Sequence, residues 1–263
     1  MTREDGGQKV IKSFKNKAGK VLYSTIPVDV DPLDRVKGLL GFAPSVKAAV
    51  PVAYSEDEIY FFKNSKYVRI NTITDTISYS NEKDIWSMWP ALYQTGFSPV
   101  NASFAAPDNP REAYFFNGSR CVRVDLWTGQ LAANGGPFNF HNKWSDLKEA
   151  VFETVDATIP FGFKGAGYEN VVCFIYQSKY ALIDVSRNVS VESGNLASRF
   201  KALENAKFRT VDAVVFKPRK NKREAYFFSG TQYVLVDLPD DRIAWGPLDV
   251  ADSWKSLKAA GFY

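Results

Sequence analysis

Runs of aromatic and β-branched residues, broken by short polar turns, recur along this chain. The clearest extends from Ala113 to Asp125, AYFFNGSRCVRVD, where two apolar stretches flank an Asn-Gly-Ser turn in the pattern of a β-hairpin. Similar segments begin at Tyr60, Cys173 and Tyr226, so the pattern returns every 53 to 59 residues. A period of this size predicts an array of structural repeats.

Each repeat shows the same succession of elements around its hairpin. A short strand comes first and a polar link precedes the hairpin; these first strands are expected at Val46–Val50, Val100–Phe104, Val155–Ile159 and Val211–Val215. A weaker fourth strand is expected at Ile77–Ser80, Gln130–Ala132, Val189–Glu192 and Arg242–Trp245.

An amphipathic segment closes each repeat, with bulky residues three and four positions apart on one helical face. These residues are Ile85, Trp89 and Leu92; Trp144, Leu147 and Val151; Leu196, Phe200 and Leu203; and Val250, Trp254 and Leu257. Four strands and a closing short helix per repeat predict an all-β fold, a single four-bladed β-propeller. Its blades are expected at residues 43–97, 98–152, 153–208 and 209–263.

Residues 1–42 precede the first complete blade and are expected to form a half-repeat arm. Val21–Ser24 matches a fourth strand, and Leu33, Val36 and Leu40 would supply the apolar face of a closing helix. Because four blades already complete a ring, the arm is expected to cover a blade edge or to exchange with a second molecule. The chain would then be a monomer or a homodimer.

Composition and charge narrow the class of protein. No apolar run approaches the roughly 20 residues that span a membrane, and the first residues, MTREDGGQKV, lack the pattern of a secretory signal. Two cysteines, Cys121 and Cys173, cannot form a disulfide framework. These features predict a cytoplasmic location, with a storage compartment or non-classical secretion left open. The mild net charge of +4 gives no reason to expect nucleic acid as a partner.

The repeat motifs resemble those of hemopexin-like repeats. They are Asp-Ala in the first strand, Tyr-Phe-Phe-x-Gly-x-x-Tyr-x-x-x-Asp in the hairpin and Trp-x-x-Leu-x-x-x-Gly-Phe at the end of the blade, and they cover residues 43–263. Among proteins of this fold, the chain is similar to the single-domain seed albumin-2 group of legumes and to fungal or bacterial relatives. The resemblance implies a non-enzymatic protein that binds a small ligand of the haem or polyamine class.

The resemblance also implies an ion in the central tunnel. In the family, main-chain oxygens at the start of each innermost strand hold Ca²⁺ or Na⁺, sometimes with chloride, and the matching residues here are Lys47, Asn101, Asp156 and Asp212. Lys47 departs from the pattern, because an ammonium group on the axis would repel a divalent ion. The alternative is that these side chains cap the turns at the strand starts.

Two further residues are candidates for ligand binding. His141 is the one histidine and the candidate axial ligand for haem, although a lone histidine before a helix is more often a solvated loop residue. Trp127 lies in a hairpin exit where no other repeat has a tryptophan, so it would be the platform for a glycan in a lectin-like or toxin-like defence protein. The alternative for Trp127 is packing on a neighbouring loop.

An enzymatic function is not expected. One histidine cannot complete a nucleophilic triad by any plausible arrangement, and the sequence contains neither a phosphate-binding glycine loop nor a His/Cys/Asp cluster with metal-ligand spacing.

Overall fold

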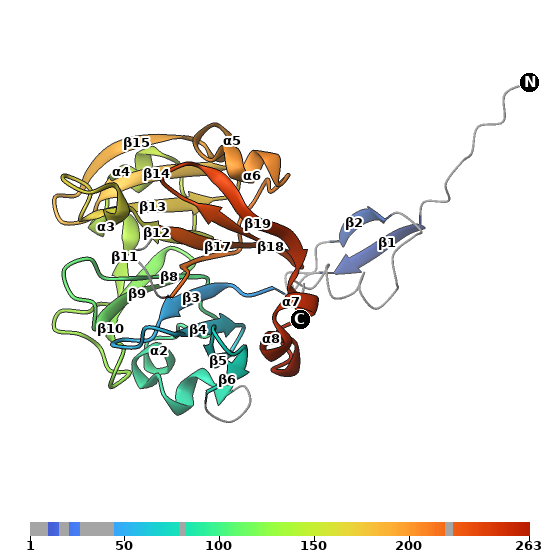
Figure 1. Ribbon diagram of the computed structural model, residues 1–263, viewed down its shortest axis with the longest axis horizontal. Helices are drawn as coiled ribbons and strands as arrows, with labels where there is room; N and C mark the ends of the chain where they lie inside the picture. Colours follow the sequence, from blue (N-terminus) through green and yellow to red (C-terminus); the bar gives the residue numbers. More distant parts are fainter. Residues whose placement is uncertain (1–9, 16–20, 27–44, 79–82, 219–222) are drawn as a thin grey trace, which may run out of the picture. The chain divides into compact units, whose positions relative to one another are not determined.

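A computed structural model describes residues 10–15, 21–26, 45–78, 83–218 and 223–263 (Figure 1). The chain divides into two compact units, Met1–Ala43 and Pro44–Tyr263. In the first unit, β1 (Val10–Lys15) and β2 (Val21–Ile26) pair as an antiparallel two-stranded sheet. The helix expected around Leu33, Val36 and Leu40 lies outside the described residues.

The second unit contains four antiparallel sheets that follow one another along the sequence (Figure 1). Blade 1 contains β3 (Ala48–Pro51), β4 (Glu58–Lys63), β5 (Lys66–Asn71), β6 (Thr76–Ile77) and β7 (Lys83–Asp84). Blade 2 contains β8 (Ala102–Ala105), β9 (Glu112–Asn117), β10 (Arg120–Asp125) and β11 (Phe138–Asn139).

The outer strands of the other two blades are longer. Blade 3 contains β12 (Ala157–Pro160), β13 (Val171–Tyr176), β14 (Lys179–Asp184) and β15 (Val189–Asn195), with the short η2 (Gly162–Lys164) after β12. Blade 4 contains β16 (Ala213–Phe216), β17 (Glu224–Ser229), β18 (Gln232–Asp237) and β19 (Arg242–Asp249). The innermost strands contact one another in the cyclic order β3, β8, β12, β16 and back to β3, so the predicted four-bladed propeller is confirmed.

Two short helices, rather than one, close each blade. They are η1 (Ile85–Ser87) and α2 (Pro90–Gln94), α3 (Phe140–Lys143) and α4 (Asp146–Glu149), α5 (Leu196–Arg199) and α6 (Lys201–Asn205), and α7 (Val250–Ser253) and α8 (Lys255–Ala259). A large aromatic residue, Trp89, Trp144, Phe200 or Trp254, separates the two helices of each pair and is buried. Because the helix is interrupted at this residue, its aromatic ring can pack in the core.

Two sequence predictions within the blades are wrong in detail. Val151 was expected on the buried helical face, but it is 61% exposed and adopts a left-handed φ of 59° just after α4. The fourth strand of blade 2 was expected at Gln130–Ala132, where the backbone makes one isolated bridge to Val124 instead. The strand that pairs with β10 is β11, because a turn with several glycines fills the segment between them.

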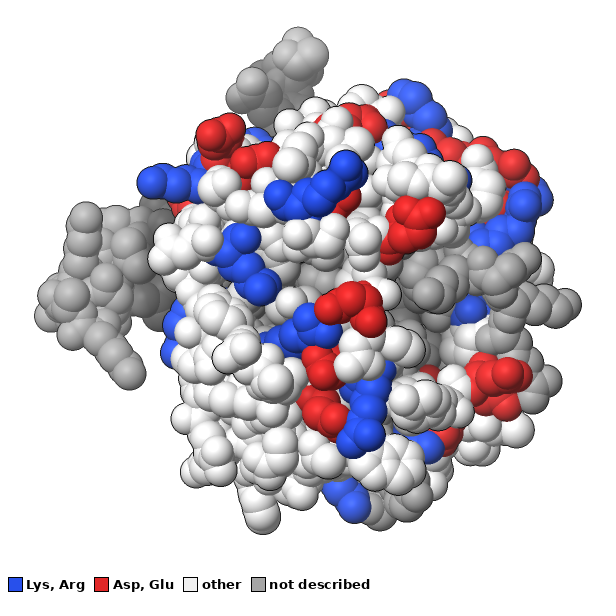
Figure 2. Space-filling model, turned by 90° about the vertical axis from the view of Figure 1, so that its left-hand side faces the viewer, with Lys and Arg blue, Asp and Glu red and all other residues white. Residues whose placement is uncertain are grey.

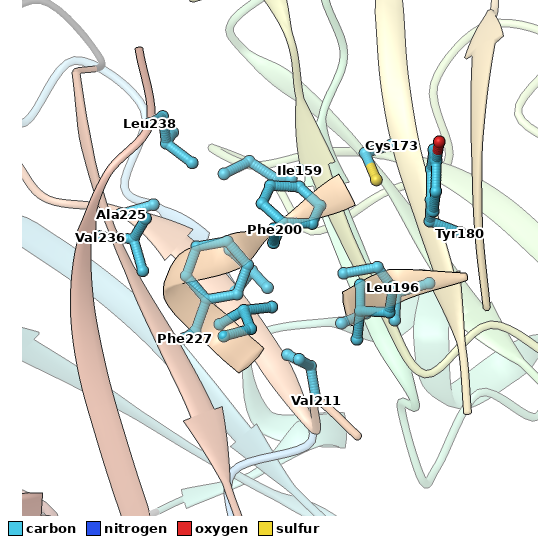
Figure 3. Packing of buried hydrophobic residues seen from close by; sticks show 14 of the residues in the cluster. Ile159, Cys173, Tyr180, Leu196, Phe200, Val211, Ala225, Phe227, Val236 and Leu238 are labelled. Atoms are coloured by element: carbon cyan, nitrogen blue, oxygen red, sulfur yellow. The ribbon is translucent and has the colours of Figure 1, made fainter. Parts of the chain in front are cut away.

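Hydrophobic clusters between neighbouring sheets hold the blades together. Figure 3 shows the contact of blades 3 and 4, where Phe200 reaches Phe227 across the boundary with 5.7 Å between the ring centroids. Both cysteines are free and buried, Cys121 in one such cluster and Cys173 in another. Within the described residues, no helix is both long and apolar enough to cross a membrane.

Candidate functional site

A pocket of about 430 Å³ lies beside blade 1, where the β10–β11 connection of blade 2 approaches it. We call it the Trp127 pocket. Its walls include Tyr60, Tyr67, Arg69, Lys83, Met88 and Trp127. Trp127 comes from blade 2 and the other five residues come from blade 1, so the site depends on the packing of the two blades.

A tight turn at the end of β10 presents Trp127 to solvent. The Asp125 carboxylate accepts hydrogen bonds from the backbone amides of Trp127 and Thr128, at 2.9 and 2.8 Å. Gly129 ends the turn at a φ of 67°, a conformation that residues with a Cβ rarely adopt. The indole of Trp127 is 69% exposed. The expectation that Trp127 packs on a neighbouring loop therefore does not describe most of its surface.

The Trp127 turn is fixed against blade 1. The Gly129 carbonyl accepts a hydrogen bond of 3.0 Å from the Ala91 amide in α2. A Cβ built on Gly129 would lie 1.9 Å from the Met88 carbonyl oxygen, so only glycine fits this approach. The turn that carries Trp127 is thus held to blade 1 by a backbone hydrogen bond to Ala91 and by the close approach of Gly129 to the Met88 carbonyl.

The inner wall of the pocket is aromatic, and a charged pair flanks it. Tyr60 and Tyr67 meet edge to face at 6.1 Å, and the Arg69 guanidinium lies 5.8 Å from the centroid of the Tyr60 ring. Arg69 also forms an ion pair with Glu58. Partial burial by itself would raise the pKa of Glu58, but the hydrogen bonds from Arg69 and other donors outweigh it and lower the pKa.

The phenol of Tyr60 is held neutral. Burial raises the pKa of Tyr60, and the nearby Arg69 charge offsets only part of that effect. The Tyr60 hydroxyl lies 3.8 Å from the Met88 sulfur. Apolar surface with a few polar groups at its edge is typical of a small-molecule site.

His141 lies in α3 and its ring is already hydrogen-bonded. Its Nε2 is 2.5 Å from the Phe152 carbonyl oxygen, so this nitrogen carries the proton and donates it. The ring also meets Phe140 edge to face at 4.3 Å. His141 therefore links α3 to the end of its blade and does not line the Trp127 pocket.

The four tunnel residues lie directly before the innermost strands. Three of them accept a hydrogen bond from the hairpin turn of their own blade: Asn101 from the Gly118 amide (3.0 Å), Asp156 from Gln177 (2.6 Å) and Asp212 from Gly230 (2.7 Å). In these three blades the side chain caps the hairpin turn between the second and third strands, not a turn at its own strand start. Lys47 instead forms an ion pair of 2.8 Å with Asp212, across the boundary of blades 1 and 4.

The charges at this end of the tunnel are unbalanced. Burial and the neighbouring Asp212 raise the pKa of Asp156, against the opposing effects of the Gln177 amide and the Lys47 ammonium. Since Lys47 pairs with Asp212, Asp156 is left without an ion pair among the described residues. In that part of the chain, no group of three or more His, Cys, Asp or Glu side chains could hold a metal ion. Any ion here would depend on main-chain oxygens.

Hydroxyl groups link the innermost strands along the tunnel. Ser103 donates to the Ala49 carbonyl over 3.2 Å, and Thr158 donates to the Ser103 carbonyl over 2.9 Å. These two bonds tie blades 1, 2 and 3 together at the axis.

The sequence suggested Trp127 as a candidate but not the other residues that line its pocket. Tyr60 begins the aromatic hairpin segment of blade 1 and is only 2% exposed, yet it also lines the cavity. A signal for the pocket lies at Met88. This residue is uncharged, whereas the corresponding residues in blades 2 and 3 are the cations Lys143 and Arg199. The Lys143 ammonium lies 5.3 Å from the Tyr114 ring, and blade 1 has no such cation at position 88.

The surface charge of the molecule is mixed. On the face shown in Figure 2, lysine and arginine side chains are interspersed with aspartate and glutamate. That face therefore carries no extended basic patch of the kind that binds nucleic acid.

Comparison with known proteins relates the chain to plant albumins and lectins. Albumin-2 of Lathyrus sativus is 26% identical over 227 residues, which cover 77% of this chain and 91% of that protein. The hemopexin fold protein CP4 from cow pea is 28% identical with a TM-score of 0.70, over 82% of this chain and 98% of that one. A plant lectin from Cicer arietinum, described as having two metal binding sites, is 26% identical with a TM-score of 0.70, over 81% and 96%. No family profile matches the chain.

These relatives bear on two of the sequence predictions. They are seed albumins and lectins, which are binding and storage proteins without an enzymatic reaction, so the expectation of a non-enzymatic protein is confirmed. The predicted cytoplasmic location is wrong, because the homologues are seed storage albumins, which are held in storage compartments. The polar first residues on which that prediction rested are a weak guide to location.

Proposed function

We propose that this chain, which is similar to seed albumin-2 and to a plant protein of the hemopexin fold, is a glycan-binding protein whose site is the Trp127 pocket. The observation that carries the proposal is the exposed indole of Trp127, held by its turn at the edge of a cavity with an aromatic inner wall. Trp86 and Trp245 are exposed as well, so exposure alone does not mark a site; Trp127 differs from them because it lines an apolar pocket with polar groups at its edge, which is typical of a small-molecule site.

The chemistry of the pocket suits a sugar ring. One face of a pyranose carries C–H groups that can lie flat on the indole of Trp127. Its hydroxyl groups then turn toward Arg69, Lys83 and Ser87, which line the same cavity. Arg69 is already paired with Glu58, so the pair together offers both donors and acceptors to hydroxyl groups. The lectin among the relatives supports a ligand of this class.

The other ligands implied by the family resemblance have less support in the geometry. Haem would need an axial ligand, and the Nε2 atom of His141 is engaged with the Phe152 carbonyl. A polyamine would need several free carboxylates, and of the two tunnel carboxylates Asp212 is paired with Lys47, which leaves only Asp156 without an ion pair among the described residues. Haem and a polyamine are therefore included as ligands in the binding test described next.

A glycan array followed by calorimetry on the best glycan tests the proposal. Trp127→Ala should weaken binding by about tenfold or more, the cost of losing a stacking contact. Trp86→Ala is the matched control, since Trp86 is also exposed, at 61%, and does not line the pocket. Equal affinity of Trp127→Ala and the wild type, or binding of haem or spermine alone, would overturn the assignment.

We also propose that a cation sits in the central tunnel, held by main-chain oxygens of Lys47, Asn101, Asp156 and Asp212. The residues fit such an ion, because Asp156 keeps an unpaired negative charge that a cation would neutralise. An ion bound only to the folded state stabilises it, by about 2.7 kcal/mol at a hundredfold excess over its dissociation constant.

Melting curves with Ca²⁺, Na⁺ and a chelator test the tunnel ion. Asp156→Asn keeps an acceptor for the Gln177 amide but removes the charge, so it should reduce the ion-dependent rise in melting temperature. Lys47→Asp should increase that rise. Melting temperatures that ignore both ions and the chelator in all three proteins would contradict the proposal.

A further inference from the structure

Blade 3 has a cavity where blade 2 places the side chain of His141. We call it the Ala197 pocket, and its volume is about 480 Å³. Its walls include Asn195, Ala197, Glu204, Lys207, Phe208 and Arg209. It shares no residue with the Trp127 pocket and is independent of the function proposed above.

The backbone around this cavity repeats that of blade 2. Three features coincide: an asparagine that caps the first closing helix, a left-handed residue after the second, and a phenylalanine whose amide bonds back to that helix. In blade 2 these residues are Asn139, Val151 and Phe152, and in blade 3 they are Asn195, Lys207 and Phe208. Because the frames match, side chains at equivalent positions can be compared directly.

The decisive difference lies at the position of His141. In blade 2 the imidazole fills the space between α3 and the end of the blade and donates to the Phe152 carbonyl over 2.5 Å. Blade 3 has Ala197 at this position, which leaves the space open. No donor bonds to the equivalent Phe208 carbonyl in the part of the chain that the structure describes. Blade 2 therefore shows which chemical group fits the empty cavity, a planar ring with an N–H donor.

The wall of the Ala197 pocket is more positively charged than the equivalent region of blade 2. Val151 and Glu153 of blade 2 are replaced by Lys207 and Arg209, which line the cavity in blade 3. The carboxylate of Glu204, also in the wall, is paired with Lys201 at 3.1 Å. The two cations favour an anionic group on the ligand.

We propose that the Ala197 pocket binds a small heteroaromatic acid. The ring takes the place of the missing imidazole and donates its N–H to the Phe208 carbonyl. The acid group of the ligand lies beside Lys207 and Arg209.

Imidazole-4-acetate is the probe, followed by NMR titration of the full chain at pH 8, where the ring is mostly neutral. The wild type should show saturable shifts at residues around the pocket. Ala197→His restores the blade 2 side chain, which occupies the proposed place of the ligand ring and should abolish these shifts, while its melting curve shows that it stays folded. Undiminished binding to Ala197→His, or no binding to the wild type, overturns the proposal.

Two further variants separate the ring from the acid. His141→Ala opens the equivalent space in blade 2 without the two cations, so it should gain a second site for plain imidazole. The double variant Lys207→Gln/Arg209→Gln should lose about tenfold in affinity for imidazole-4-acetate and little for imidazole. If His141→Ala gains no site, the match between the two blades does not determine the ligand, and the inference is wrong even if Ala197→His were unstable.

Discussion

At the scale of single residues, the last acidic or amide residue of the hairpin stabilises the turn that follows in blades 1, 2 and 3, where Asn71, Asp125 and Asp184 accept backbone amides of that turn. Asp184 shows this most strongly, because its carboxylate accepts hydrogen bonds from the Ser186 and Arg187 amides and also from both of their side chains. Burial alone would raise the pKa of Asp184, but these donors outweigh it and lower the pKa from 3.8 to about 2.

The lowered pKa of Asp184 predicts a pH dependence of stability. The carboxylate is ionised more easily in the folded than in the unfolded chain, so its contribution is full above pH 3.8 and is lost as the pH falls toward about 2. Asp184→Asn should be less stable than the wild type in urea at pH 6, and the difference should shrink at pH 2. The exposed Glu149→Gln serves as the control. A difference between Asp184→Asn and the wild type that does not change with pH would contradict this assignment.

Gly129 shows where a single residue controls the candidate site. Gly129→Ala would place a Cβ against the Met88 carbonyl in a left-handed conformation, so the turn that carries Trp127 must shift. We expect a loss of stability of about 1 kcal/mol or more and weaker glycan binding. Gly118→Ala is the control, because Gly118 is also left-handed but has nothing within 4 Å of its Cβ position. Equal effects of the two variants on binding would show that the close approach does not matter.

At the scale of elements, one turn position in blades 1, 2 and 4 holds the closing helix of the preceding blade. Asp75 accepts from the Lys255 and Ser256 amides at the start of α8, and Asp241 accepts from the Lys201 and Ala202 amides at the start of α6. In blade 2 the same position is Gly129, which uses its carbonyl. A residue of one blade thus supplies the N-terminal cap that the closing helix of the preceding blade lacks in its own sequence.

Asp75→Ala should lower the free energy of unfolding by about 1 kcal/mol, the usual cost of losing such a cap. Asp75→Asn keeps an acceptor and tolerates the left-handed φ of 49°, so it should cost less. Chemical denaturation of both variants, with Asp241→Ala as the equivalent at the boundary of blades 3 and 4, measures the effect. Wild-type stability of Asp75→Ala would show that solvent replaces the cap.

The elements that could be predicted from sequence are those with strong local signals. The hairpins around Tyr114 and Tyr226 were placed correctly, because aromatic strands on both sides of a short turn leave little choice of register. The fourth strand of blade 2 and the exposure of Val151 could not be predicted, since the first depends on a turn in which Asn134 is left-handed alongside two glycines and the second on the left-handed conformation of Val151 itself. The Trp127 pocket was only partly predictable, because it arises between segments from two blades.

At the scale of the whole molecule, side chains close the ring where its two ends meet. The Val46 amide donates to the Tyr263 hydroxyl over 2.9 Å, and the Lys63 ammonium donates to the Gly261 and Phe262 carbonyls. Burial raises the pKa of Tyr263, so the hydroxyl stays protonated at all ordinary pH values. Together with Asp75 and the pair of Lys47 with Asp212, these contacts join blade 4 to blade 1.

Tyr263→Phe should destabilise the protein by about 1–3 kcal/mol, because the amide of the fully buried Val46 loses its acceptor. The effect is measured by denaturation at neutral pH, with Tyr93→Phe as the control, since Tyr93 is 62% exposed. If the two variants are equally stable, the hydroxyl of Tyr263 contributes nothing to ring closure.

Because side-chain contacts close the ring of blades, the ring does not depend on which blade comes first in the sequence. Among the residues that the structure describes, every strand of the four blades pairs only with strands from its own consecutive segment, and no strand is shared between the first and last blades. The covalent connections between blades are therefore no more important for the arrangement of the blades than the non-covalent contact at Tyr263. A gene that encodes the blades in the order 3, 4, 1 and 2, with a short linker from residue 263 to residue 45, should give the same ring. Circular permutation succeeds where the two joined segments lie close together, and here the Val46 amide contacts the Tyr263 hydroxyl.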